Sequence, residues 1–216
     1  MSVYDCADTE QRTAGLAAAR TALQSGELVV MPTDTLYGIG CDAFDSTAVD
    51  RLLRAKGRGR DMPVPVLIGS WATIDGLVSV VTPQMRDLTR AFWPGALSLV
   101  VAQAPSLAWD LGDAHGTVML RMPLHPVALE LLRAHGPMAV SSANVSGRAP
   151  AATMADARTQ LGGAVSVYLD GGPSEHAVAS TIVDVSAGAP RILREGAVAA
   201  ERVAEVLGVD AQALRA

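Results

Sequence analysis

The sequence predicts a single α/β domain built around a mixed β-sheet. Strand-like apolar runs and helical patterns intermix along the whole length of the 216 residues. Half of the residues are hydrophobic, which is enough material for one sizeable core. No internal repeat and no low-complexity linker divides the chain. One domain is therefore the simplest organisation.

The helices are predicted from periodicity and from their start and stop signals. Asp8 followed by Gln11 forms a possible capping box before a helix that runs to about Gln24, and Gly26 ends it. Thr82 and Pro83 are a good N-cap and first-turn pair. Further helices are expected at 46–56, 71–81, 126–135, 154–161 and 199–207, the last followed by a frayed tail.

The strands are predicted from short apolar runs that stop at proline, glycine or polar residues. They are expected at 28–31, 63–68, 96–102, 117–121, 138–141, 165–169, 180–185 and 191–194. The run 63–68 contains two prolines, which predicts an edge or irregular strand. Gly38 and Gly40 indicate a glycine-spaced loop after 28–31, and the turn 188–190 predicts a hairpin between the last two strands.

Composition excludes several classes of function. A net charge of −5 argues against bulk affinity for nucleic acid, although five of the seventeen basic residues lie within 51–60. The apolar runs are far too short for a membrane span. Cys6 and Cys41 form no C-x-x-C motif and no signal peptide is visible, which fits a reduced cytoplasm. The four histidines lack the spacing of a zinc site: His115, His125, His135 and His176.

Lys56 is the first candidate for chemistry. It is the only lysine in the chain, and it lies at helical spacing from Val49, Leu52 and Leu53. An ammonium at the end of an apolar stripe is expected to point toward the body of the protein. The alternative is a surface lysine whose aliphatic stem packs on the core.

Polar residues follow several of the predicted strands and could gather at one rim of the sheet. They are Thr35, Arg121, Ser142 with Asn144, Ser180 with Thr181, and Arg194. Together with Lys56 and Arg58, the two strand-end arginines could supply four positive charges to one cavity, which suits a polyanion such as a phosphate. No P-loop, dinucleotide-binding fingerprint or nucleophilic serine motif is present.

Seven ordered segments resemble the YrdC-like family. They are PTDTLYG at 32–38, KGR at 56–58, FWPG at 92–95, RMP at 121–123, SSANVSG at 141–147, STIVD at 180–184 and ILR at 192–194. The resemblance covers about residues 10–200, leaving a short tail within 199–216. It implies a twisted mixed sheet, flanked by helices, around a concave and positively charged cavity. It also implies a nucleotidyl transfer that converts L-threonine, bicarbonate and ATP to threonylcarbamoyl-AMP and pyrophosphate, for modification of tRNA beside the anticodon.

The resemblance assigns roles to individual residues. Four positions match those around threonine: Thr35, Arg121, Ser142 and Ser180. Lys56, Arg58, Asn144 and Arg194 match positions around ATP, together with Thr117. Lys56 and Arg58 are expected to be catalytic by stabilising negative charge.

The resemblance also bears on cofactors and partners. Mg²⁺ is expected on the ATP phosphates and water, with no protein side chain as its ligand. The implied partners are a downstream tRNA threonylcarbamoyl-transferase complex and, weakly, tRNA itself. Met62 and Leu67 depart from the family's Asn and His, so side-chain contacts from these two places cannot be assumed.

Two other functions stay open on the sequence. One is a binding module for structured RNA that uses the basic residues of 51–60, although aromatic residues for base stacking are scarce. The other is a domain that forms carbamoyl-AMP, as in the hydrogenase-maturation carbamoyltransferase, whose additional zinc-finger and acylphosphatase-like segments have no counterpart in this sequence.

Overall fold

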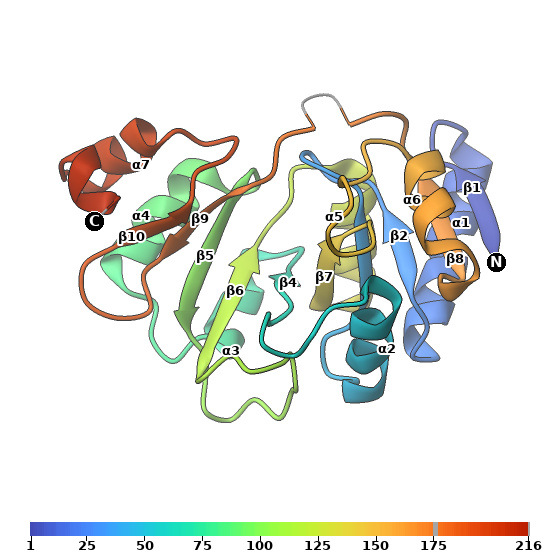
Figure 1. The fold of residues 1–216 in the computed structure, drawn as a ribbon, viewed down its shortest axis with the longest axis horizontal. Coiled ribbons are helices and arrows are strands. Elements are labelled where there is room, and N and C mark those ends of the chain that lie inside the picture. Colours follow the sequence, from blue (N-terminus) through green and yellow to red (C-terminus); the bar gives the residue numbers. More distant parts are fainter. Residues whose placement is uncertain (175–176, 216) are drawn as a thin grey trace.

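The computed structural model describes residues 1–174 and 177–215 (Figure 1). His176 and Ala216, named above among the histidines and in the tail, lie outside the described residues. The helices are α1 (Thr9–Gln24), α2 (Ser46–Lys56), α3 (Ile74–Leu77), α4 (Pro83–Phe92), α5 (Pro126–His135), α6 (Met154–Leu161) and α7 (Ala200–Leu207). The strands are β1 (Ser2–Asp5), β2 (Val29–Met31), β3 (Gly38–Asp42), β4 (Val66–Leu67), β5 (Leu97–Ala102), β6 (Thr117–Arg121), β7 (Met138–Ser142), β8 (Val167–Asp170), β9 (Thr181–Asp184) and β10 (Arg191–Arg194).

All strands of the described chain join one sheet in the order β1-β8-β2-β3-β7-β4-β6-β5-β9-β10. Pairs such as β1–β8 and β5–β9 are parallel, whereas β3–β7 and β5–β6 are antiparallel. The prediction of an α/β domain around a mixed sheet is confirmed. The hairpin of β9 and β10 is antiparallel, also as predicted.

Two apolar clusters fill the two faces of this sheet. Strand alternation sends Val29 and Met31 of β2 into one cluster, which α1 and α5 cover, and Val30 into the other. The second cluster also takes in Leu52 and Leu53 of α2 and reaches α4 and α7. Lys56 ends the buried stripe of α2 and is 2% exposed, so its predicted inward direction is confirmed.

The glycine-spaced segment predicted as a loop is the strand β3. Its Gly38 and Gly40 pair with Ser142 and Val140 of β7. A Cβ atom at Gly38 would lie 2.7 Å from Val140 Cγ1, and one at Gly40 would lie 2.9 Å from Val140 Cγ2. These glycines therefore permit close packing inside a sheet, which the sequence alone does not distinguish from a flexible loop.

The edge-strand alternative for 63–68 is wrong, because β4 lies inside the sheet between β7 and β6. The ladder pairs involve Val66 and Leu67, after both prolines, and the Pro65 carbonyl accepts a hydrogen bond from Val140 N at 2.8 Å. Proline lacks only the donor, so its carbonyl still serves the sheet. The helix expected over 71–81 is also shorter: a 3-10 turn over Trp71–Thr73 leads into α3, which ends at Leu77.

The tail is packed rather than frayed. A 3-10 helix covers Ala211–Leu214, and Leu214 is buried against the core. The guanidinium of Arg215 lies 3.0 Å from Glu195 and 2.9 Å from Glu201. Strand β1, which was not predicted from the sequence, pairs with β8 at the edge of the sheet opposite β10. Within residues 1–174 and 177–215, no helix combines the length and apolar character that crossing a bilayer requires.

Candidate functional site

A cavity of about 260 Å³ opens where several strands meet their loops. The structure brings six of the predicted site residues to its wall: Thr35, Arg58, Arg121, Ser142, Ser180 and Arg194. Apolar side chains also line it, among them those of Leu67, Met119, Val140 and Ile182. None of the described residues that line this cavity carries a carboxylate. Three guanidinium groups therefore face one small volume, which suits an anionic ligand.

Arg121, at the end of β6, is held on all three nitrogens. Nε donates to the Gly95 carbonyl at 2.9 Å, Nη1 to Thr35 Oγ1 at 2.9 Å, and Nη2 to Asp34 Oδ1 at 2.6 Å. Burial lowers the pKa of Arg121, whereas Asp34 raises it. The side chain stays charged, because an arginine pKa starts far above neutrality.

Arg58 and Arg194 are held differently. Arg58 donates to the carbonyls of Met62 and Pro63, at 2.9 and 3.1 Å, and to Ser141 Oγ at 3.2 Å. Arg194 donates to the Ser180 carbonyl at 2.7 Å and to Ser180 Oγ at 3.2 Å. Among the described residues, neither guanidinium has a carboxylate within ion-pair distance. Their positive charges therefore stay available to a ligand.

Ser98, on β5, also belongs to the cavity. Its Oγ lies 2.9 Å from Ser180 Oγ, and its side chain is buried. No pattern in the sequence points to Ser98, since it lies within the apolar run 96–102. A hydroxyl inside such a run ordinarily bonds to the backbone, so only the contact with Ser180 makes it a candidate.

Lys56 lies behind the cavity wall. Its Nζ donates to the carbonyls of Ser142 and Asn144, the latter at 2.7 Å, and lies 3.3 Å from Asn144 Oδ1. An ammonium has three N–H donors, and these three oxygens account for all of them. Burial, with a smaller contribution from Arg58, lowers the pKa of Lys56 to about 8. Lys56 thus holds the loop that follows β7.

Two other predicted ATP residues do not line the cavity. The side-chain amide of Asn144 donates to the carbonyls of Val145 and Arg148, at 3.1 and 2.8 Å. Thr117 begins β6, whereas Arg121 ends it, so about 13 Å of strand separates them. The Thr117 hydroxyl donates to the Ala114 carbonyl at 2.7 Å. In this structure Asn144 and Thr117 stabilise local turns.

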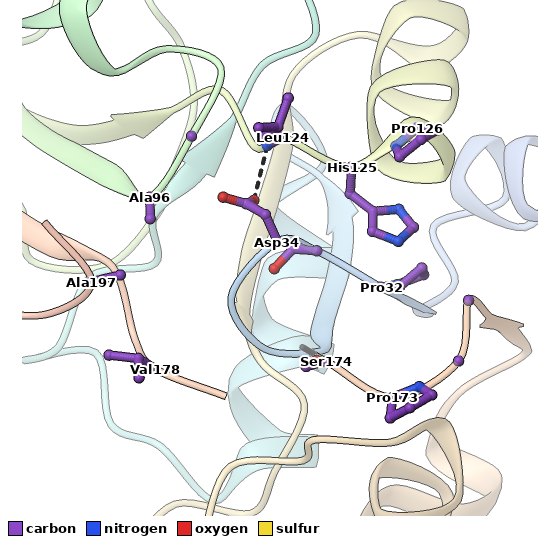
Figure 2. Close-up of a pocket in the computed structure, with 14 residues that line it drawn as sticks. Pro32, Asp34, Ala96, Leu124, His125, Pro126, Pro173, Ser174, Val178 and Ala197 are labelled. Carbon is purple, nitrogen blue, oxygen red and sulfur yellow. Dashed lines mark hydrogen bonds between the residues drawn. The ribbon is translucent and has the colours of Figure 1, made fainter. Parts of the chain in front are cut away.

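A second, larger pocket of about 880 Å³ adjoins the cavity, and Thr33 lines both (Figure 2). Its wall combines prolines and glycine backbone with Leu124, His125 and Asp34. No described lining residue is lysine or arginine, and burial lowers the pKa of His125, which favours the neutral ring. This pocket therefore does not suit a polyphosphate.

The family model Sua5/YciO/YrdC, described as "Telomere recombination", matches residues 21–196. The chain belongs to this family. A relative from Mycobacterium tuberculosis is 68% identical over 211 residues, which are 98% of this chain and 97% of the relative.

More distant members of the Sua5/YciO/YrdC family are named after the reaction product, threonylcarbamoyl-AMP. The threonylcarbamoyl-AMP synthase of Pyrococcus abyssi is 33% identical over 187 residues, 86% of this chain. This chain spans only 55% of that relative's length. The crystal structure of P. abyssi Sua5 complexed with L-threonine matches with a TM-score of 0.89 and 30% identity, over 96% of this chain and 61% of that chain.

Met62 and Leu67, the two residues expected to depart from the family pattern, differ in their location relative to the cavity. Leu67 lines the cavity, so an apolar side chain stands at this position of the site. Met62 has an exposed side chain, and its carbonyl accepts the bond from Arg58 Nε. Met62 thus serves the site through its backbone.

The basic stretch 51–60 is largely engaged within the protein. Arg60 lies 2.5 Å from Asp110, 3.4 Å from Asp50 and 3.9 Å from Asp113. Arg51 donates to the Gly26 carbonyl at 2.7 Å. An RNA-binding face needs unpaired cations along a surface; the ion pairs of Arg60 remove one of them, and the bond of Arg51 fixes the direction of a second.

Proposed function

We propose that this protein condenses L-threonine, bicarbonate and ATP to threonylcarbamoyl-AMP and pyrophosphate. The observation that carries the proposal is the cavity itself, which places Arg58, Arg121 and Arg194 beside the hydroxyls of Thr35 and Ser180. The name of the P. abyssi relative and the threonine complex of P. abyssi Sua5 support the choice of substrates.

The chemistry needs an electropositive pocket with polar orienting groups. The threonine amine reacts with bicarbonate to give a carbamate and water. A carbamate oxygen then attacks the α-phosphorus of ATP, and the bond to the β-phosphate oxygen breaks to release pyrophosphate. Both partners of the second step are anions, so nearby cations lower its barrier by offsetting their repulsion.

The partners of the three arginines suggest how the substrates divide the cavity. Arg58 and Arg194 have only neutral partners among the described residues and would take the phosphates. Arg121, with Thr35 beside it, would take the single carboxylate of threonine, with Ser142 and Ser180 as orienting hydroxyls.

The remaining predicted ATP residues would act mainly through the backbone that they hold. Lys56 would contribute by fixing the loop of Ser142 and Asn144, because its N–H donors are already occupied. Direct contacts of Asn144 and Thr117 with ATP would require these side chains to exchange their present partners.

The described residues that line the cavity supply no carboxylate ligand for Mg²⁺. Asp34 lies beside the lining residues Thr33 and Thr35, and its Oδ1 already accepts from Arg121 Nη2 and from Leu124 N. We therefore propose that the metal reaches the site on phosphate oxygens and water, which Mg²⁺ commonly retains.

We further propose that the product passes to a tRNA threonylcarbamoyl-transferase complex in the cytoplasm, where ATP, bicarbonate and tRNA meet. A mixed anhydride of a carbamate and AMP is reactive toward water, so direct delivery would preserve it. Any contact with tRNA would be weak, given the net charge of −5 and the paired Arg60.

The decisive experiment is mass spectrometry of the product formed from ATP, ¹³C-bicarbonate and threonine, with pyrophosphate measured in parallel. We expect AMP-linked threonylcarbamate that carries the label, and pyrophosphate release that requires both threonine and bicarbonate. ADP and orthophosphate would contradict the proposal. Carbamoyl-AMP formed from carbamoyl phosphate without threonine would instead favour the carbamoyl-AMP function, and salt-dependent RNA binding without ATP turnover would favour the RNA-binding module.

A further inference from the structure

The guanidinium of Arg121 is only partly used by the protein. It has five N–H donors, of which one goes to the Gly95 carbonyl, one to Thr35 Oγ1 and one to Asp34 Oδ1. Two donors remain, one on each terminal nitrogen. Since Arg121 lines the cavity, a ligand there can accept from this pair, and a carboxylate has two oxygens at a suitable spacing.

Asp34 fixes the orientation of this group. Its Oδ1 accepts from Arg121 Nη2 at 2.6 Å and from the backbone N of Leu124 at 2.9 Å, the bond drawn in Figure 2. One oxygen thus ties the loop after β2 to both the end of β6 and the segment that follows it. The side chains of Arg121 and Asp34 are 8% and 15% exposed, so little water competes for the pair.

The same contact changes the charge along the cavity. Arg121 is offset by a carboxylate at bonding distance, whereas Arg58 and Arg194 donate to carbonyls and hydroxyls within the described chain. A polyphosphate is therefore attracted more strongly to Arg58 and Arg194 than to Arg121. Arg121 offers a fixed geometry with a weaker net charge, which favours a single carboxylate.

We infer that Asp34 is a positioning residue for the amino-acid substrate, acting through Arg121. It touches no substrate itself. It holds the guanidinium at the cavity wall, where the donors that the protein does not use can serve a ligand, and its charge makes phosphate binding at Arg121 less favourable. This inference rests on the proposed function, since it names the substrate group that Arg121 takes.

The test compares Asp34→Ala with Asp34→Asn by steady-state kinetics, each substrate being varied in turn. Asp34→Ala should raise the apparent threonine constant tenfold or more and leave that for ATP within about twofold. Asp34→Asn keeps an oxygen that accepts from Leu124 N and Arg121 Nη2, so its threonine constant should rise less. Asp42→Ala is a matched control, because Asp42 Oδ1 accepts from Phe44 N at 2.8 Å and its other oxygen lies 3.3 Å from His135, outside the cavity lining. Both constants should stay unchanged in Asp42→Ala.

Calorimetric binding of threonine without ATP is measured on the same proteins, so the inference is tested even if turnover is absent. Threonine binding weakened in both Asp34 variants, in the order Ala more than Asn, supports it. Equal effects on threonine and ATP, or an unchanged threonine affinity, overturn it. If Asp34→Ala does not fold, Asp34→Asn decides by the same criterion. A wild-type protein that binds threonine but releases no pyrophosphate contradicts the proposed function alone.

Discussion

The Nζ atom of Lys56, at the end of α2, lies 2.7 Å from the carbonyl oxygen of Asn144, which follows β7. The contact joins two segments that are 88 residues apart in the sequence. Ser142, which lines the cavity, gives the same ammonium its carbonyl. The only lysine of the chain thus anchors the loop from which a proposed substrate-binding hydroxyl projects.

Lys56→Met should therefore reduce kcat/KM strongly. Without the ammonium, the carbonyls of Ser142 and Asn144 lose a buried donor and the loop moves away from its place beside the cavity. We expect a loss of about 2–4 kcal/mol of transition-state stabilisation, measured as pyrophosphate release. Arg54→Met, an exposed change on the same helix, is the control. An unchanged kcat/KM in a folded Lys56→Met protein would refute the prediction.

The lowered pKa of Lys56 also predicts a pH dependence of stability. Lys56 titrates near 8 in the folded protein and near 10.5 in the unfolded chain. Between these values the unfolded state binds the extra proton, so the free energy of unfolding should rise with pH across this window. The buried thiol of Cys6, with its pKa raised by burial to about 11, acts in the opposite direction above pH 9.

The measurement is urea unfolding of the wild type and Lys56→Met at pH 7.5, 8.5 and 9.5. Subtracting the two curves cancels the thiols and every other group common to both proteins. The stability of the wild type relative to the variant should increase from pH 7.5 to 9.5. A flat difference would show that Lys56 keeps its ordinary pKa, and a difference that decreases with pH would show that folding raises this pKa; either result would contradict the prediction.

Helices with a local start signal could be predicted closely from the sequence. Thr82 caps α4 through a bond from Met85 N, and Pro126 opens α5, so each boundary depends on neighbouring residues alone. Strand β3 was missed because Gly38 is required by Val140, which is far away in the sequence. Strand β1 was missed because its partner is β8, where Val167 pairs with Ser2 across most of the chain.

The site residues likewise fall into those that local sequence predicts and those that depend on distant partners. The places of Arg121 and Ser180 in the cavity could be predicted because both residues lie at the ends of predicted strands. The inward direction of Lys56 could be predicted from its helical spacing. Partners across the fold could not be predicted from spacing. Two hydrogen bonds depend on loops and strands that only the folded sheet brings together. They join Ser98 to Ser180 and Arg121 to Asp34.

Gly38→Ala should destabilise the protein by about 1–3 kcal/mol, because overpacking a core forces side chains from their preferred rotamers. The added Cβ would lie 2.7 Å from Val140 Cγ1. Combining it with Val140→Ala removes that methyl, so the double variant should lose less stability than the sum of the two single variants. Gly76→Ala in α3, where an added Cβ meets no atom within 4 Å, is the control. Simple additivity in chemical denaturation would argue against the close contact.

Replacing Arg121 or Arg194 by lysine, one at a time, should separate threonine binding from ATP binding. Lysine keeps the positive charge but loses the planar fork that binds a carboxylate through two donors. Arg121→Lys also gives up bonds to Gly95, Thr35 and Asp34 that hold the fork in place. Its apparent threonine constant should therefore rise much more than its ATP constant. Arg194→Lys should do the reverse, since Arg194 reaches the cavity from β10 with only the Ser180 carbonyl and hydroxyl as partners.

Steady-state kinetics of both variants with each substrate varied, beside calorimetric binding of ATP, provides the measurement. If both variants weaken ATP alone, Arg121 does not hold the threonine carboxylate, and hydroxyls such as that of Thr35, together with backbone amides, must hold it instead.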